Sequence, residues 1–213
     1  MHDSRVKDFL KDFMQKEFFV FDKGDFLFRE GDPVLGMYYV ISGYVKYMKS
    51  ESRGKETILS IYKPGDIVGL REGITCDVHA GRAVACSPVS AGLILKDDFK
   101  TRMECEAKLS LKVMKMLCES TDSMETKLVN IRDKPANERL AGLLVFLAEN
   151  FGLDDDKRLS IELSRGDIAK LVGTTRGNIS SIISAYEKSH ILQMTGDSLY
   201  LTDINKLRKY AGE

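Results

Sequence analysis

A short run of residues, TRGNISS from position 175 to 181, brings an arginine, an asparagine and hydroxyl side chains within two turns of a helix. Arginine donates two parallel hydrogen bonds to guanine, and asparagine pairs with adenine in the same bidentate way. Thr175 is of a type that caps the first turn of a helix, so the residues after it would stand on exposed N-terminal turns. The candidate base-reading residues are Arg176, Asn178, Ser180 and Ser181. The chemistry that this run could perform is recognition of base edges in the major groove of DNA.

The residues around this run have the spacing of two helices that cross at a steep angle. Ser164, followed three residues later by an aspartate, is typical of the start of the first helix. Ala169 is small where the two helices would touch, and Gly173 can adopt the positive φ that a tight turn requires. Ile179 and Ile182 then supply the apolar inner face of the second helix. This spacing predicts a helix-turn-helix.

The flanking sequence supplies further elements that would position this motif. Residues 137–150 predict an amphipathic helix, and residues 158–163 alternate between apolar and polar types as a strand does. After the motif, residues 191–194 and 198–201 read as two strands joined by a turn at Gly196. Such a hairpin beside a helix-turn-helix is a wing.

The middle of the chain predicts a long helical region from 97 to about 133. One stripe recurs at alternating steps of three and four residues and favours a two-stranded dimer seam: Met114, Leu117, Thr121, Met124, Leu128 and Ile131. Leu109, Val113 and Met116 form a second stripe that could pack on the N-terminal domain. The alternative to a dimer seam is a long helix that lies across its own domain. Pro135 ends the helical region.

The N-terminal part has a different pattern. Residues 1–17 predict a short amphipathic helix, and residues 18–95 form short β-rich runs separated by glycine-containing turns, with a strong turn signal in the segment PGDIVG. The glycines at the expected turns are Gly24, Gly31, Gly43, Gly54, Gly65 and Gly69. Many short strands with regular turns predict a small antiparallel barrel or roll.

Composition narrows the functional classes. Lys and Arg number 32, as do Asp and Glu, but residues 157–209 contain nine basic and five acidic side chains. No stretch has the length and apolarity of a membrane span, and the N-terminus lacks a secretory pattern, so we expect a cytoplasmic protein. The cysteines have neither the spacing of a zinc site nor that of a disulfide framework, and we expect buried free thiols: Cys76, Cys86, Cys105 and Cys118.

The order of a glycine-marked β-roll, a long helix and a winged helix resembles the cyclic-AMP receptor protein/fumarate-nitrate regulator (CRP/FNR) family of bacterial transcription factors. The resemblance covers nearly the whole chain, and its most specific parts are PGDIVG and SRGDIAKLVGTTRGNISSII. It implies a homodimer that binds a roughly palindromic operator on double-stranded DNA, an effector sensed by the roll, and RNA polymerase as a partner. It further implies that Arg176 reads a base, whereas Ser164, Arg165 and Thr175 contact phosphate.

We therefore predict an α+β chain with three parts. Residues 1–97 would form an effector-sensing antiparallel β-roll, a jelly roll like that of cyclic-nucleotide-binding domains. Residues 98–134 would form the dimerisation helix, and residues 135–213 the winged-helix DNA-binding domain.

The sequence departs from the cyclic-AMP-binding members of this family. The position of their ribose-binding glutamate holds Leu70, their arginine–serine pair for the phosphate is missing although Arg82 lies close by, and Met124 and Glu125 replace their base-contacting threonine and serine. An equatorial phosphate needs a charge-assisted donor, so we do not expect cyclic AMP as the ligand. The candidate effector-pocket residues are Leu70, Arg71, His79, Arg82, Met124 and Glu125.

Two cofactors of the family can be compared with the residues present. An iron–sulfur cluster is not expected, because the cluster-binding members carry an N-terminal group of cysteines and no cysteine here precedes Cys76. Haem stays open, with His79, Cys76 and Met124 as candidate axial ligands. No metal site is expected.

Motifs of catalysis are missing from the sequence. It contains no Gly-rich phosphate loop, no H-E-x-x-H motif and no nucleophile elbow, so we do not expect an enzyme. For the N-terminal domain two classes stay open, namely a sensor of a small molecule and a scaffold that dimerises without a ligand.

Overall fold

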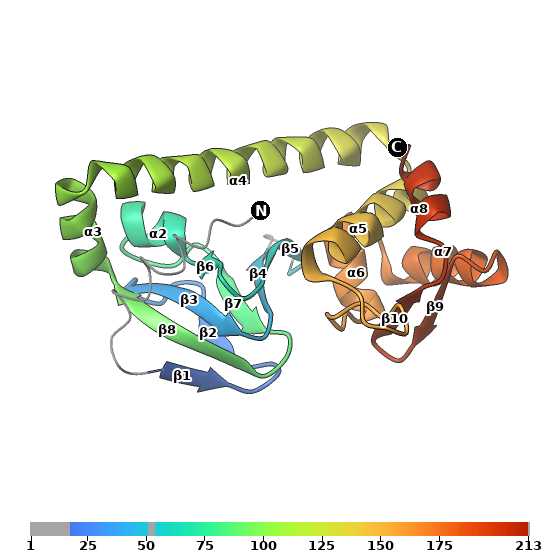
Figure 1. Cartoon of the computed structure of the whole chain (residues 1–213), viewed down its shortest axis with the longest axis horizontal. Helices are drawn as coiled ribbons and strands as arrows, with labels where there is room; N and C mark the ends of the chain where they lie inside the picture. The colour runs from blue at the N-terminus through green and yellow to red at the C-terminus, as the bar shows by residue number, and fades with distance from the viewer. Residues whose placement is uncertain (1–17, 51–53, 213) are drawn as a thin grey trace. The chain divides into compact units, whose positions relative to one another are not determined.

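The computed structural model describes residues 18–50 and 54–212, and the helix expected over 1–17 lies outside them. Contacts divide the chain into two compact units, and the boundary falls between Asp122 and Ser123, within the long helix α4 (Ala107–Asp133). Figure 1 shows this helix and labels the elements of both units. The sequence predicted three parts with boundaries at residues 97 and 134, in which the long helix is a part of its own. This three-part division stays a prediction.

The first unit is built on two four-stranded antiparallel sheets. One sheet has the order β1 (Phe18–Phe21), β8 (Val89–Leu95), β3 (Gly36–Ser42), β6 (Ile67–Val68). The other has the order β2 (Phe26–Phe28), β7 (Arg82–Ala85), β4 (Val45–Ser50), β5 (Glu56–Tyr62). All six glycines expected at turns adopt positive φ. The predicted antiparallel roll is confirmed.

The core of this unit follows from strand alternation. Val40, Val45 and Ala91 belong to an apolar cluster drawn from strands of both sheets, which therefore fills the space between them. Met37 and Ile94 instead join a second cluster with residues of the helices. Because neighbouring side chains of a strand point to opposite faces, strands β3, β6 and β8 are buried on both sides.

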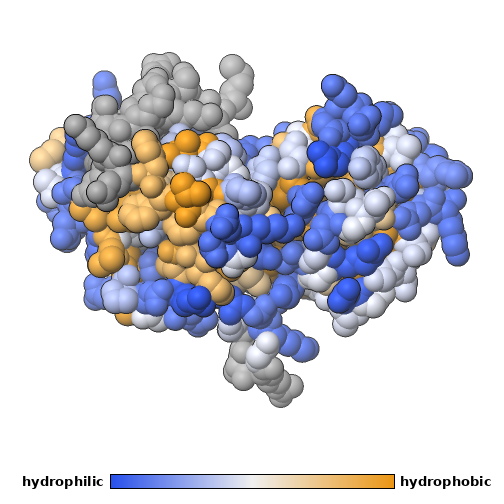
Figure 2. All heavy atoms as spheres, turned by 90° about the horizontal axis from the view of Figure 1, so that it is seen from below, coloured by the Kyte–Doolittle hydropathy of each residue, from blue (hydrophilic) through white to orange (hydrophobic). Residues whose placement is uncertain are grey.

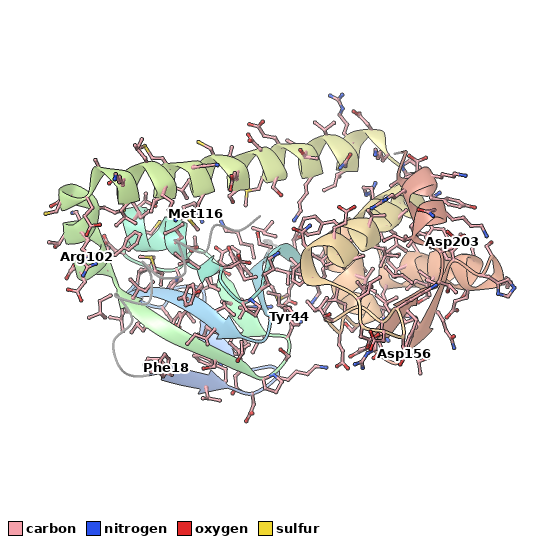
Figure 3. All side chains as sticks on the ribbon, viewed as in Figure 1. Phe18, Tyr44, Arg102, Met116, Asp156 and Asp203 are labelled. Atoms are coloured by element: carbon pink, nitrogen blue, oxygen red, sulfur yellow. The ribbon has the colours of Figure 1, made fainter. Side chains whose placement is uncertain are left out.

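Helices cover the second face of the β1–β8–β3–β6 sheet. They are α2 (Leu70–Thr75), α3 (Lys96–Cys105) and the first half of α4. Leu109 and Val113 of α4 are buried in this cluster, and Met116 packs against it on the side of α4 that faces α2 (Figure 3). The prediction that this second stripe packs on the N-terminal domain is confirmed.

Two details of the helical region differ from expectation. It consists of two helices, because Glu106 between α3 and α4 leaves the helical conformation at φ −119° and ψ 89°. Cys86 is buried as predicted, but Cys105 and Cys118 are exposed. The expectation of buried thiols was wrong for these two, which lie on exposed faces of α3 and α4, and Cys76 is only partly buried.

The second unit contains the end of α4 and a helical domain. Its elements are α5 (Ala136–Phe151), α6 (Arg165–Val172), α7 (Arg176–Lys188), β9 (Leu192–Thr195), β10 (Ser198–Leu201) and α8 (Ile204–Ala211). Leu140, Leu144, Ile168, Ile179 and Leu199 are fully buried and form much of its core. Pro135 separates α4 from α5, as predicted. The expected hairpin and the expected helix over 137–150 are present.

The strand expected over residues 158–163 does not form. Leu159, Ile161 and Leu163 are buried, so the alternation itself was right. The segment makes isolated pairings with Leu153 and with the wing, such as Leu159 N to Leu199 O at 2.8 Å and Leu163 N to Asp197 O at 3.0 Å. Alternating burial therefore arises here without a continuous hydrogen-bonded ladder.

The surface differs between the two units. On the face drawn in Figure 2, apolar side chains gather over the first unit, whereas the second unit presents mainly hydrophilic ones. Phe18 and Val20 of β1 and Leu35 are exposed apolar residues of the first unit. No helix in the described part of the chain has the length and apolarity needed to cross a membrane.

Among the described residues of the first unit, His79 is a buried polar side chain with 3% of its surface exposed. Its ring stacks on that of Phe28, with 3.6 Å between the centroids and 8° between the planes. Its Nδ1 has no hydrogen-bond partner among the described residues. Burial lowers the pKa of His79, although Glu72 and Asp32 oppose the shift. The fold thus favours the neutral imidazole.

This burial predicts a pH dependence of stability. A histidine whose pKa is lowered by folding contributes fully above its unfolded pKa of about 6.5, and the contribution is lost as the pH falls below that value. We expect the thermal stability of the protein to decrease from about pH 7 to pH 5. His79→Gln should flatten this dependence in calorimetry. His190→Gln, at an exposed histidine, is the matched control and should keep it. An unchanged slope in His79→Gln would contradict the prediction.

Candidate nucleic-acid interface and sensor site

The first helix of the helix-turn-helix starts and ends as its residue types require. Ser164 Oγ accepts a hydrogen bond from Asp167 N at 3.1 Å and donates one to Asp167 Oδ2 at 2.9 Å. At the other end, Gly173 has φ 72° and ψ 49°, and its N–H donates to Ala169 O at 2.9 Å. Because glycine adopts this left-handed conformation without strain, the chain can turn into α7 within two further residues.

The second helix, α7, is capped and anchored on one face. Thr175 Oγ1 accepts a hydrogen bond from Asn178 N at 3.2 Å. The buried face consists of Ile179, Ile183 and Tyr186, so Ile183 takes the inner position that was predicted for the half-buried Ile182. The two isoleucines are about 100° apart around the helix, and the crossing of α6 and α7 selects the second.

Tyr186 connects α7 to the rest of the unit. Its O–H donates to Asn137 O of α5 at 2.9 Å, and burial raises the pKa of Tyr186 to about 12. The phenol is therefore neutral at physiological pH and remains a hydrogen-bond donor. One face of α7 is fixed in this way.

The predicted base-reading residues lie at the start of α7. Arg176, Asn178 and Ser181 are exposed, and Ser180 is half-buried. The smaller side chains already have local partners, because Asn178 Nδ2 donates to Thr174 Oγ1 at 2.9 Å. Ser180 and Ser181 likewise donate to the carbonyls four residues earlier. Arg176 is thus the long exposed donor of this surface, and the helix N-terminus adds a partial positive charge beside it.

The predicted phosphate-contacting residues surround the same surface. Arg165 is the first residue of α6 and is half-buried, and Ser164 and Thr175 are the N-caps of α6 and α7. Free backbone N–H groups at helix N-termini are suited to bind phosphate oxygens.

The wing is fixed to α7. β9 and β10 pair from Leu192–Leu201 to Thr195–Ser198, and Gly196 in the turn has φ 60°. Glu187 of α7 accepts a hydrogen bond from Met194 N at 3.0 Å. The wing is therefore bonded to the C-terminal end of α7.

The candidate effector-pocket residues have different surroundings in the structure. Leu70 is buried among the residues under the helices, and Arg71 is exposed. Arg82 forms an ion pair with Glu56, and His79 is buried against Phe28. Met124 and Glu125 are exposed on the part of α4 that belongs to the second unit.

A buried carboxylate in the first unit was not anticipated. Glu72 of α2 is only 3% exposed, and it accepts a hydrogen bond of 2.5 Å from Tyr47 O–H. Arg71 Nη2 lies 3.3 Å from the same oxygen. Burial and then the bond to Glu72 raise the pKa of Tyr47 well above its ordinary value. The only available signal was an acidic residue shortly after PGDIVG, and sequence alternation does not identify such a pair.

The candidate metal and haem ligands have different surroundings among the described residues. In the described residues, no group of three or more His, Cys, Asp and Glu side chains is arranged to hold a metal ion. Of the candidate haem ligands, His79 is stacked on Phe28, Cys76 Sγ lies 3.3 Å from Thr75 Oγ1, and Met124 belongs to the other unit.

Comparison with known domains agrees with both units. Residues 18–104 match the cyclic nucleotide-binding domain, and residues 138–210 match the Crp-like helix-turn-helix domain. The first match covers the two sheets and α2, and the second covers the helix-turn-helix and the wing.

Curated relatives span most of the chain. It is 27% identical over 195 residues to the electron transport regulator A of Shewanella oneidensis, with 89% of this chain and 76% of the relative covered. It is 28% identical to the fumarate and nitrate reduction regulatory protein of Vibrio cholerae, with the same coverage. Among solved structures, FixK2 from Bradyrhizobium japonicum shares the fold, with a TM-score of 0.81, 23% identity, and 91% and 96% of the two chains covered. The two domain matches, in this order along one chain and joined by a long helix, together with relatives that are regulators, show that the chain is a transcriptional regulator of the CRP/FNR family.

Proposed function

We propose that the protein acts as a homodimer on a roughly palindromic operator in the cytoplasm of a bacterial cell, where its DNA target lies, and that RNA polymerase is a partner. It acts by binding rather than by catalysis. The observation that carries the proposal is the capped and exposed N-terminus of α7, which presents Arg176. In helix-turn-helix proteins this end of the second helix enters the major groove.

We assign some of the exposed side chains to base recognition and others to phosphate binding. Arg176 is long enough to place its guanidinium on the O6 and N7 atoms of a guanine. Asn178, Ser180 and Ser181 would have to break their local hydrogen bonds to contact bases. The loss of these bonds offsets part of the binding free energy that the base contacts provide. Arg165, Ser164, Thr175 and the wing would hold the phosphate backbone. Because Gly177 and Ser181 are short, direct contacts to base edges are few, and Arg176 dominates specificity.

Dimerisation is attributed to the exposed apolar stripe of α4. Over its 27 residues the helix is about 40 Å long. Met114, Met124, Leu128 and Ile131 of the stripe are exposed in the single chain, Leu128 to 71%. Leu117, in contrast, is half-buried and packs against the first unit. A second copy of α4 would cover the exposed apolar side chains, as in a two-stranded coiled coil.

The roll is proposed to sense a small molecule other than cyclic AMP. A cyclic phosphate needs a charge-assisted donor, whereas Arg82 of this roll is paired with Glu56 and Leu70 offers no polar group. A relative in Mycobacterium tuberculosis, 24% identical, is described as a cAMP-activated regulator. The polar residues of this roll therefore favour a different ligand chemistry, or a roll without a ligand.

The dimer proposal predicts the effect of a charge in the stripe. Leu128→Asp removes about 2 kcal/mol of apolar burial per subunit and adds the desolvation cost of a carboxylate, so we expect monomers in sedimentation. Val129→Asp is the matched control, because Val129 is also exposed and apolar but lies outside the stripe. The coiled-coil proposal fails if Leu128→Asp sediments as a dimer.

The DNA proposal predicts different effects for two arginines. Arg176→Ala should cost about 1–3 kcal/mol and relax the preference at one guanine position of the operator. Arg165→Ala, as the matched control, should weaken binding to all sequences equally and lower the salt slope by about one. The measurement is binding to randomised operators at several salt concentrations. An unchanged sequence preference in Arg176→Ala would show that α7 does not read DNA in this way.

The sensor proposal predicts the absence of cyclic AMP binding. Calorimetry of the dimeric protein should show no saturable heat with micromolar cyclic AMP, because a buried carboxylate and a paired arginine leave the phosphate without a donor. Operator binding by the same preparation serves as the control for folding. Saturable binding at one site per subunit would overturn the argument from Leu70, Glu72 and Arg82.

A further inference from the structure

Arg139, in the first turns of α5, bonds to backbone carbonyls of two other elements. Its Nη1 donates to Lys134 O at 2.6 Å and to Ile131 O at 3.4 Å, and these carbonyls lie at the end of α4. Its Nε donates to Val172 O at 2.9 Å and its Nη2 to Gly173 O at 3.2 Å, both at the end of α6. A single guanidinium therefore bridges the long helix and the turn of the helix-turn-helix.

The bridge forms where helix C-termini meet. α4 ends at Asp133 and α6 ends at Val172, and the last carbonyls of each helix have no partner within it. Both termini carry a partial negative charge, which favours a cation between them. Lys134 Nζ caps the end of α8 in the same manner through Ala211 O at 2.7 Å. Planar guanidinium donors suit several carbonyls in different directions, which an ammonium group does not reproduce.

A direct contact lies beside this bridge. A Cβ placed on Gly173 would lie 3.6 Å from Ile131 Cδ1, so the turn of the motif rests against the last turns of α4. The chain itself passes from α4 to α5 through only Lys134 and Pro135. The Gly173 turn, and with it α7, is therefore held to α4 by the Arg139 bonds and the Ile131 contact.

We infer that Arg139 is a positioning residue that sets the orientation of α7 relative to the dimer helix, and thereby the half-site spacing that the dimer accepts. The inference rests on the proposed dimer and on DNA reading by α7. If each α7 is fixed to its own α4, and the two α4 helices pair in the dimer, the two α7 helices have a fixed separation. One added base pair displaces a half-site by about 3.4 Å and rotates it by about 35°, which a rigid dimer cannot follow.

The experiment measures spacing selectivity rather than affinity alone. An operator is first selected with the wild-type protein, and versions with one base pair more or fewer between the half-sites are compared with it. We expect the wild type to bind these versions about tenfold or more weakly. Arg139→Met, which keeps the side-chain length and removes all donors, should bind the selected operator about tenfold more weakly and show a spacing preference of about threefold or less. Preference for the guanine read by Arg176 should persist.

Two further variants make the result specific. Arg208→Met removes an exposed ion pair with Glu149, 2.8 Å long, that joins α8 to α5 in the same unit, and it should behave as the wild type. Arg139→Lys keeps the charge without the planar donors, so it should also lose spacing selectivity, although less than Arg139→Met.

The outcomes separate this inference from the proposed function. If Arg139→Met weakens binding by the same factor at every spacing, Arg139 has only a structural role and the inference is wrong. If Arg139→Met does not fold, full spacing selectivity in Arg139→Lys overturns the inference. If the wild type selects no palindromic operator, the proposed function itself fails.

Discussion

The helix-turn-helix depends on one steric constraint: the chain must turn from α6 into α7 within the three residues from Gly173 to Thr175. Gly173 meets it with a left-handed conformation, and Thr175 supplies a cap at the point where α7 begins. Ala169 keeps the crossing close because its side chain is a single methyl group. Only after this turn is made do Ile179 and Ile183 face inward and Arg176 face outward. The exposed base-reading surface is thus a consequence of how the buried side is packed.

The long helix α4 has different neighbours along its length. Leu109 and Val113 are buried under the first unit, whereas Ile131 lies against the turn at Gly173. Ile131 also belongs to the apolar stripe that includes Leu128, and both side chains remain exposed in the single chain. α4 therefore contributes to both units, and each part of it has its own packing partners.

Much of the fold could be predicted because periodicity reports burial. The glycine-separated strands, the second stripe of α4 and the helix-turn-helix all follow from repeated spacing, and the structure contains them. Two details did not follow, for different physical reasons. Ile182 and Ile183 are adjacent, so only the crossing angle decides which one is buried. Residues 158–163 alternate in burial but do not form a continuously hydrogen-bonded strand. The pattern of apolar residues reports burial and does not show whether the backbone pairs with another strand.

The two most informative polar residues, Glu72 and Arg139, had no sequence signal, since each acts through partners far away in the chain. Glu72 lies 25 positions from Tyr47, and Arg139 bonds to a carbonyl 34 positions away. A buried carboxylate is stable only if it is hydrogen-bonded, and a cation between helix termini is effective only when those termini converge. Both conditions are created by the tertiary fold. Residues such as Glu72 and Arg139 are therefore harder to predict than the candidate base-reading residues, because a local motif positions the latter and contacts between distant segments position the former.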